Sequence, residues 1–331
     1  MNDPEILTTK FLTGLVRKFK NEMFPLTALG LFPEKPMRGH QAEWDVIEMS
    51  RALGELSGGS STSKPIDGDP VSKQSVEMYK AFFNTVVDEE ALIGLRNPGS
   101  TELQKIGEDE VGRRSAKLAK KIDRMKEFLI SQALQSTGSI KLDGKTVNLP
   151  DRIAGGHKFS GSDWSDESTK ILEDVDADLQ VIEEDSGEMP RFALTSRECI
   201  TALMQNETIG GFMNSTPAGV DYLVTGNLRQ FKGLTWIAHN LTYKPTGGSP
   251  TRFIGENKIV YLPGPDREIA EMQVGSVAVP SADGKRAEEK IGRHAWSALK
   301  VDPVETVLYI IERFFPTIYQ PDAFAIRTWK A

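Results

Sequence analysis

The sequence predicts an α+β fold, in which one long amphipathic helix is combined with strands spread along the rest of the chain. Residues 101–136 carry the strongest helical signal, because apolar residues recur there at three- and four-residue spacing. Segments on both sides of this helix alternate polar with β-branched or aromatic residues, which is typical of strands. Asp143 and Gly144 separate two such segments, and this dipeptide between alternating residues predicts a β-hairpin.

The predicted helix at 101–136 has one continuous apolar stripe. Its members fall in two interleaved rows of seven-residue spacing: Val111, Leu118, Met125 and Gln132, and Ser115, Ile122 and Leu129. Ser100 or Thr101 fits the N-terminal cap and Gly138 fits the C-terminal stop. A helix of this length spans roughly 50 Å. A dimeric coiled coil is the alternative, but the stripe is short and mixed for one.

Residues 4–24 are expected to form an amphipathic helix. Phe11, Leu15 and Phe19 belong to an apolar row that repeats every four residues, and basic residues lie between them. Two interpretations stay open for this segment. It is either a surface helix that binds a partner or a membrane, or a helix that packs on its own domain. A signal peptide is disfavoured, because charges interrupt every apolar stretch.

Two extended segments, Gln41–Leu53 and Val71–Val87, flank a Gly/Ser-rich tract at residues 54–70. Trp44, Val46, Val76 and Phe82 alternate with polar residues in them, as in strands. Such a tract buries too little apolar surface to order itself, so the sequence predicts a long hairpin that projects from the body. An interdomain linker between two unrelated strands is the alternative.

The second half is predicted to mix short helices and strands. Helices are expected at residues 166–185 and Ser196–Asn206. Strands are expected at Arg191–Thr195, Gly233–Leu241, Phe253–Leu262, Met272–Val279, Ala295–Leu299, Val304–Phe314 and Ala323–Trp329. Phe315-Pro316 and Pro321 are expected to break the last two strands, because proline lacks the N–H that a ladder needs.

The composition argues against several classes of protein. The 331 residues carry a net charge of −7, which disfavours a protein that grips DNA through a basic face. The single cysteine, Cys199, excludes an internal disulfide, suggests a reducing compartment, and is expected to be buried and inert. No apolar run is long enough to cross a membrane as a helix.

The sequence contains no recognisable catalytic or metal-binding motif. P-loop, dinucleotide-binding, zinc and nucleophile-elbow signatures are missing, and the four histidines are scattered. Asp174-Val-Asp-Ala-Asp178 imitates the start of a calcium loop but lacks its glycine and glutamate, so it is interpreted as a solvated acidic helix. We therefore expect no catalytic residue, no cofactor and no metal.

The order of several segments resembles the lambda-type major capsid proteins of tailed bacteriophages, which share the Hong Kong 97-type fold. The resemblance covers most of the chain, and no single segment is highly specific. The segments that carry it are Glu90–Gly99, Leu118–Glu127, Gln132–Gly138, Phe253–Pro263 and Pro321–Ala325.

The resemblance implies a subunit with named parts. Residues 1–35 would be the N-terminal arm, and residues 36–90 the extended β-hairpin loop. A peripheral domain would take residues 91–164 and 300–331, with the spine helix at 101–136, and an axial domain would take residues 165–299. The assembly interface of arm and loop would then include Phe11, Leu15, Phe19, Trp44, Val46, Val76 and Phe82.

The resemblance also implies a non-catalytic subunit that assembles with its copies into hexamers and pentamers of an icosahedral shell around double-stranded DNA. It implies a separate scaffolding protein (or a cleaved segment), a portal, and a place in the virion after assembly in the host bacterial cytoplasm. A decoration protein stays open, and neither sequence-specific DNA binding nor a membrane is expected. The alternatives are an encapsulin-like compartment shell and an enzyme of unknown class.

Overall fold

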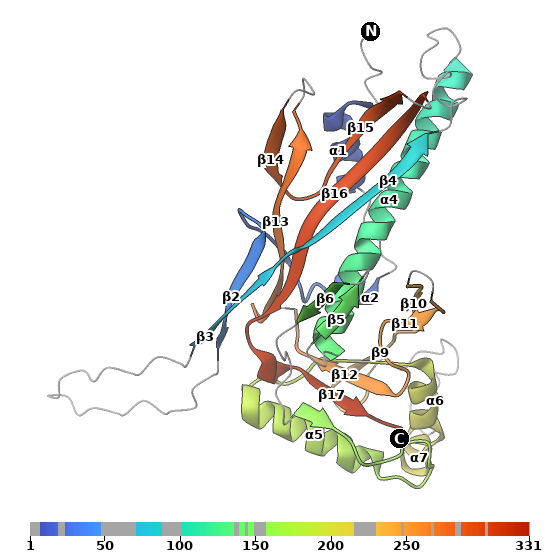
Figure 1. Cartoon of the computed structure of the whole chain (residues 1–331). Coiled ribbons are helices and arrows are strands. Elements are labelled where there is room, and N and C mark those ends of the chain that lie inside the picture. Colours follow the sequence, from blue (N-terminus) through green and yellow to red (C-terminus); the bar gives the residue numbers. More distant parts are fainter. Residues whose placement is uncertain are drawn as a thin grey trace, which may run out of the picture. The chain divides into compact units, whose positions relative to one another are not determined.

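The computed structural model describes residues 7–18, 24–47, 71–87, 101–135, 139–142, 145–148, 157–214, 230–245, 248–265, 268–281, 286–301 and 304–330 (Figure 1). The chain divides into two compact units. Unit 1 comprises Met1–Ala42, Ser75–Ile130 and Glu271–Thr317, and unit 2 comprises Glu43–Gln74, Ser131–Ala270 and Ile318–Ala331. Each unit therefore combines segments that are far apart in the sequence.

Unit 1 is built on a six-stranded sheet in which the longest strand, β16, pairs with three others. Its pairs with β4 and β15 are antiparallel, and β1 pairs with β13 in parallel. The strands of this sheet are β1 (Glu34–Pro36), β4 (Tyr79–Val87), β13 (Ala270–Pro280), β14 (Ala287–Ile291), β15 (His294–Val301) and β16 (Val304–Ile318).

The helix expected at 101–136 is present as α4 (Thr101–Gln135), and it runs beside β4 and β16 of unit 1 (Figure 1). Its apolar stripe faces inward as expected at Val111, Leu118, Ile122 and Leu129, each of which is buried. Met125 and Gln132 differ from the expectation, since both are only half-buried. The stripe therefore drifts around the helix, because seven residues are slightly fewer than two turns.

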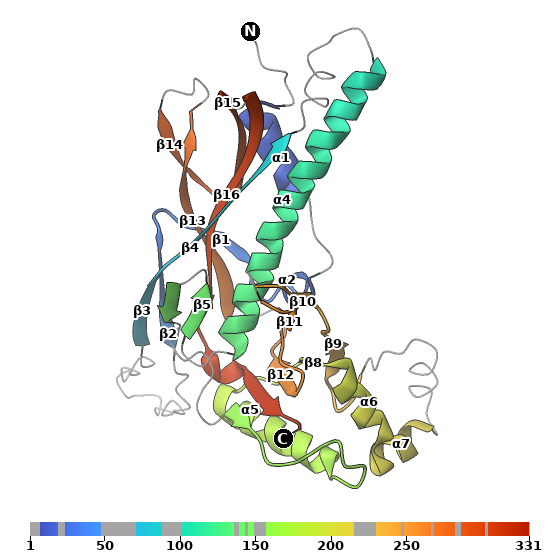
Figure 2. The same cartoon turned by 45° about the vertical axis from the view of Figure 1, so that its right-hand side comes forward.

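The N-terminal helix of unit 1 is α1 (Thr9–Lys18), followed by a single turn, α2 (Pro25–Ala28). Figure 2 shows α1 beside β15. Leu12 and Val16 are buried, and the Thr13 hydroxyl lies 3.1 Å from both the backbone N and O of Ala295. Of the two interpretations left open by the sequence, α1 packs on its own domain through this face.

The two strands expected around the Gly/Ser tract form a two-stranded ribbon of β2 (Gln41–Ile47) and β3 (Val71–Glu77). The tract itself lies outside the described residues. The second predicted strand, 71–87, is divided at Met78 into β3 and β4. The backbone N–H of Met78 turns aside there to donate to the carbonyl of His40, at 2.9 Å.

Unit 2 contains a five-stranded sheet in the order β7-β17-β12-β8-β9. The strands are β7 (Lys158–Phe159), β8 (Phe192–Thr195), β9 (Thr235–Ala238), β12 (Lys258–Leu262) and β17 (Ala325–Thr328). Its helices are α5 (Ile171–Ser186), α6 (Arg197–Gln205), α7 (Glu207–Asn214) and the 3₁₀ turn η3 (Pro321–Ala323). It also contains two small hairpins, β5 (Ser139–Leu142) with β6 (Lys145–Asn148) and β10 (Thr242–Tyr243) with β11 (Thr251–Arg252). Most of the β2–β3 ribbon falls within its bounds as well.

The hairpin predicted from Asp143-Gly144 is confirmed by the pairing of β5 with β6, where Leu142 stands opposite Lys145. Helix α6 begins where the sequence predicted, since the Ser196 hydroxyl accepts the N–H of Cys199 at 3.2 Å. The prediction that Phe315-Pro316 ends a strand was wrong, because β16 runs on to Ile318. Proline is tolerated there because pairing with β4 ends at Phe314, so no β4 residue stands opposite Pro316.

Candidate assembly surface

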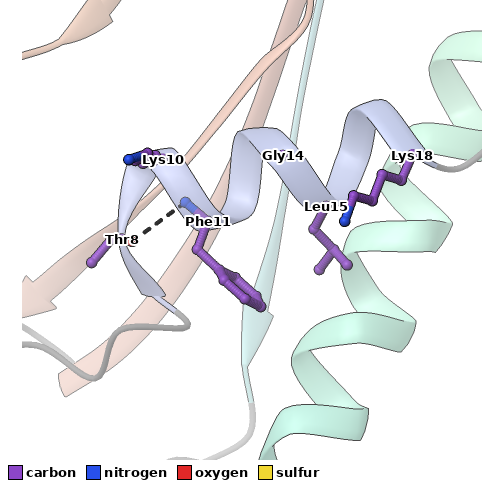
Figure 3. Close-up of a pocket in the computed structure, with 6 residues that line it drawn as sticks. All are labelled: Thr8, Lys10, Phe11, Gly14, Leu15 and Lys18. Atoms are coloured by element: carbon purple, nitrogen blue, oxygen red, sulfur yellow. Dashed lines mark hydrogen bonds between the residues drawn. The ribbon is translucent and has the colours of Figure 1, made fainter.

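The first candidate surface is the outer face of α1 (Figure 3). Thr8, Lys10, Phe11, Gly14, Leu15 and Lys18 line a groove of about 310 Å³ along this helix. Phe11 is 42% exposed, and its side chain projects on the same side of the helix as that of Leu15. Two lysines border this apolar pair, and the described helix carries no acidic residue. Helix α1 thus packs with one face and leaves an apolar, basic face exposed. Phe19 lies outside the described residues.

The second candidate surface is the β2–β3 ribbon. Alternate side chains of β2 are buried at Ala42 and Trp44, as the period of two predicted, while Val46 and, on β3, Val76 are half-buried. The exposed apolar side chains of the ribbon are Ile47 at 38% and Val71 at 59%. Trp44 therefore belongs to a packed face. The exposed apolar side chains of the ribbon, Ile47 and Val71, are not among the interface residues that the sequence analysis predicted.

The base of the ribbon, formed by Gly39 before β2 and Met78 after β3, lies against β13 within unit 1. Gly39 accepts the N–H of Ser276 through its carbonyl at 2.8 Å and donates its own N–H to the Ser276 hydroxyl at 3.0 Å. A Cβ on Gly275 would lie 2.5 Å from the Met78 sulfur and 2.8 Å from the Gly39 carbonyl oxygen. Glycine at 275 therefore lets the segments that enter and leave the ribbon lie close against the sheet.

The third candidate surface is an aromatic cluster on the outer face of the unit 1 sheet. Phe82 of β4 stacks with Trp296 of β15 at 5.8 Å and with Tyr309 of β16 at 5.7 Å between ring centroids. Trp296 and Tyr309 are opposite each other in the sheet register, and their centroids lie 5.4 Å apart. Phe82 remains 46% exposed in this position. The three rings therefore form a stacked cluster that leaves Phe82 partly open to solvent.

The acidic helix α5 differs from the solvated helix expected from Asp174-Val-Asp-Ala-Asp178. Asp178 is 2% exposed and accepts hydrogen bonds from Arg327 and from the Tyr261 hydroxyl. Asp174 accepts the indole N–H of Trp164 at 2.9 Å. Only Asp176 of the three is exposed. The predicted helix is present, but solvation was the wrong expectation for Asp174 and Asp178. Asp174 has a donor ten residues away, and the donors to Asp178 come from strands that are distant in the sequence.

Cys199 is buried, as expected, and burial raises the pKa of its thiol to about 12. Among the residues that the structure describes, no group of three or more His, Cys, Asp or Glu side chains could hold a metal ion. Within the same residues, no helix has the length and apolar character needed to cross a membrane.

Three solved structures with a similar fold cover nearly all of this chain. One is a protein described as the capsid protein of an Escherichia coli CFT073 prophage. It has 12% identity over 97% of this chain and 99% of that chain, with a TM-score of 0.64. Another is a phage-related protein from Bordetella bronchiseptica RB50, with 13% identity over 98% of both chains and a TM-score of 0.59. A virus-like particle from Pyrococcus furiosus matches at 14% identity over 99% and 100%, with a TM-score of 0.51.

These likenesses establish the fold, which is the α+β phage capsid fold of the Hong Kong 97 type that the sequence predicted. The class of fold is therefore one that capsid proteins adopt. No curated protein sequence matches the chain. The family model of the phage major capsid protein E matches residues 8–300, and the chain belongs to this family.

Proposed function

We propose that the protein is a lambda-type major capsid subunit that tiles with its copies, as hexamers and pentamers, into the icosahedral head shell around packaged double-stranded DNA. Membership of the capsid protein E family and the capsid fold support this proposal. In this role the subunit is not an enzyme, and the shell encloses DNA without sequence-specific binding. It assembles in the host bacterial cytoplasm with a separate scaffolding protein and a portal, while a decoration protein is left open.

The observation that carries the assembly proposal is the exposure of large apolar side chains at two sites of unit 1, Phe11 on α1 and Phe82 on β4. Their exposed fractions are 42% and 46%, although each lies beside buried residues of the same element. Exposed aromatic side chains held by rigid elements are typical of interface anchors, whose burial between subunits contributes most of the contact energy. Leu15 adds to the first site.

We also propose the following parts for the subunit, from its resemblance to capsid proteins. Residues 1–35 form the arm and residues 36–90 the extended loop, with Trp44, Val46 and Val76 on the ribbon. The peripheral domain comprises residues 91–164 and 300–331, with the spine helix at 101–136, and the axial domain lies at residues 165–299. The anchored base of the ribbon at Gly39 and Met78 supports a loop that extends from a fixed point.

The experiment that tests the proposal is assembly of the purified full chain, with and without its scaffolding protein, followed by sedimentation and electron microscopy. We expect capsomers and closed shells, and we expect Phe82→Asp and Phe11→Asp to abolish them while the circular dichroism of the subunit stays unchanged. Asn84→Asp, an exposed position next to Phe82 on the same face of β4, is the matched control for added charge.

Two outcomes would contradict the proposal. A chain that stays monomeric under every assembly condition would overturn the shell function, and normal shells from both aspartate variants would overturn the assigned contacts. Particles that hold a protein cargo instead of DNA would favour the encapsulin-like alternative, which the family assignment makes the weaker one.

A further inference from the structure

A chain of ion pairs lies inside unit 1 where α4 meets the sheet. Lys126 of α4 contacts Glu312 of β16 at 2.6 Å and Glu34 of β1 at 2.5 Å. Arg293, just before β15, contacts the other oxygen of Glu312 at 2.7 Å and Asp123 of α4 at 2.5 Å. We call these five residues the buried ion network.

The network is removed from water at its centre. The side chains of Lys126 and Glu312 are 3% and 2% exposed, and those of Arg293 and Asp123 are 10% and 14% exposed. Burial raises the pKa of Glu312, but Lys126 and Arg293 outweigh it, so its pKa lies below the ordinary value. Burial raises the pKa of Asp123, and Arg293 only partly offsets this. Glu312 is thus held as a carboxylate by two cations from different elements.

The rest of this contact is apolar and has a repeating pattern. Leu308, Ile310 and Phe314 share the α4-facing side of β16 with Glu312, because side chains alternate along a strand, and all three are buried. Buried aliphatic side chains also recur along α4 at spacings of four and seven residues, as at Leu118, Ile122 and Leu129. Apolar contact is non-directional, so a slide of α4 by one turn would exchange one aliphatic neighbour for another.

The ion pairs do not tolerate such a slide. A displacement of one turn, about 5.4 Å, would separate Lys126 from both of its carboxylates and Asp123 from Arg293. Glu312 would keep Arg293, but the ammonium of Lys126 would be buried without an opposite charge. We propose that the buried ion network is a register lock, which permits one axial position of α4 against the β4–β16–β15 sheet where the surrounding apolar contacts would accept more than one. This inference concerns the subunit alone and does not depend on shell assembly.

A purely stabilising network and a register lock make different predictions for apolar replacement. Replacing a whole buried ion network by apolar residues of similar volume is often neutral or stabilising. If stability were its only role, the replaced protein would keep one structure. A lock predicts a protein that stays folded and samples a second position of α4.

The test uses the full chain with Asp123→Leu, Lys126→Met, Arg293→Met and Glu312→Leu combined. Spin labels are placed on exposed cysteines introduced at Lys117 of α4 and at either Lys80 of β4 or Leu299 of β15. Lys80 and Leu299 stand opposite Arg313 and Thr306 of β16, at different points along that strand, so a slide changes at least one distance. The buried thiol of Cys199, with its pKa of about 12, stays unlabelled.

We expect one narrow distance distribution for each label pair in the unsubstituted chain and in the control Arg124→Met, an exposed position of α4. We expect a second population, displaced by up to about 5.4 Å, in the fourfold variant, with an unchanged or higher denaturant midpoint. Distributions identical to those of the control would overturn the lock. If the fourfold variant does not fold, Asp123→Asn with Lys126→Met replaces it, because this pair of substitutions removes the ion pairs between α4 and the sheet and leaves Arg293 with Glu312. The same two outcomes then decide.

Discussion

Arg327 and Asp178, 149 residues apart, form a two-point ion pair inside unit 2. The guanidinium of Arg327 on β17 donates to both carboxylate oxygens of Asp178 on α5, at 2.7 Å and 2.5 Å. The Tyr261 hydroxyl of β12 donates to the same carboxylate at 3.0 Å. This cluster ties the helix to two neighbouring strands of the five-stranded sheet.

Removal of one partner of this pair should destabilise unit 2 strongly. We expect Arg327→Met to lower the free energy of unfolding by about 3–5 kcal/mol, because it leaves the Asp178 carboxylate buried without its cation. Arg327→Met with Asp178→Leu should recover most of the loss. Urea unfolding of the subunit measures both, and Arg252→Met, at a more exposed ion pair, is the control. Equal losses in the single and double variants would contradict the argument.

Glycine at position 275 is required by the close approach of the ribbon's base. We expect Gly275→Ala to cost about 1–3 kcal/mol, because its Cβ would press on the backbone carbonyl of Gly39 as well as on Met78. Gly112→Ala is the matched control, since Gly112 lies in α4 with open space around the added carbon. That control should stabilise by about 0.5–1 kcal/mol through helix propensity. A stabilising Gly275→Ala would show that the ribbon's base yields easily.

The two kinds of position on the α4 stripe should respond differently to truncation. We expect Ile122→Ala to cost about 2–5 kcal/mol, because Ile122 is completely buried and its loss leaves a cavity. Met125→Ala should cost clearly less, because Met125 is half-buried at the edge of the stripe. Thermal or urea unfolding ranks the two variants, and the reverse order would mean that the packed face of α4 is assigned to the wrong residues.

His294 should make unit 1 less stable as the pH falls. Burial lowers the pKa of His294 from its ordinary value of 6.5, the Ile291 carbonyl raises it in part, and Arg17 and Lys290 lower it further. Because the folded-state pKa is depressed, the stabilising contribution is present above 6.5 and is lost as the pH falls through the lowered value.

The test compares urea midpoints at a pH above 6.5 and at a pH below it. His294→Gln should reduce the difference between the two midpoints, because glutamine has no imidazole that the folded state disfavours protonating. His40→Gln is the control, because His40 is exposed. A pH dependence that is the same in His294→Gln and in the unsubstituted chain would assign the effect to other groups.

Much of the secondary structure was predictable because it depends on local pattern. The 35-residue helix α4, the Ser196 cap of α6 and the hairpin around Asp143-Gly144 each follow from residues within a few positions of one another. Strands β13 and β16 were also predicted, but the residues at which they end were not. Pro316 lies within β16, at a position where pairing with β4 has already ended.

The candidate surfaces were predictable only in part. The alternation around Trp44 and Phe82 was read correctly as strand, but alternation does not say which face meets water. Trp44 is 4% exposed and Phe82 is 46% exposed. The outward ribbon residues Ile47 and Val71 were missed for the same reason, because their exposure depends on segments that pack from elsewhere in the chain.

The sequence by itself determined the class of fold, the long amphipathic helix and the resemblance to capsid proteins, because periodicity and segment order are properties of neighbouring residues. Which charged side chains are buried was decided by the tertiary structure alone. Asp178, Glu312 and Lys126 look like ordinary solvated residues in the sequence, yet they are buried with partners more than 80 residues away. Burial of a charge is costly unless an opposite charge lies beside it. These opposite charges come from distant segments, so the local sequence pattern does not predict the burial.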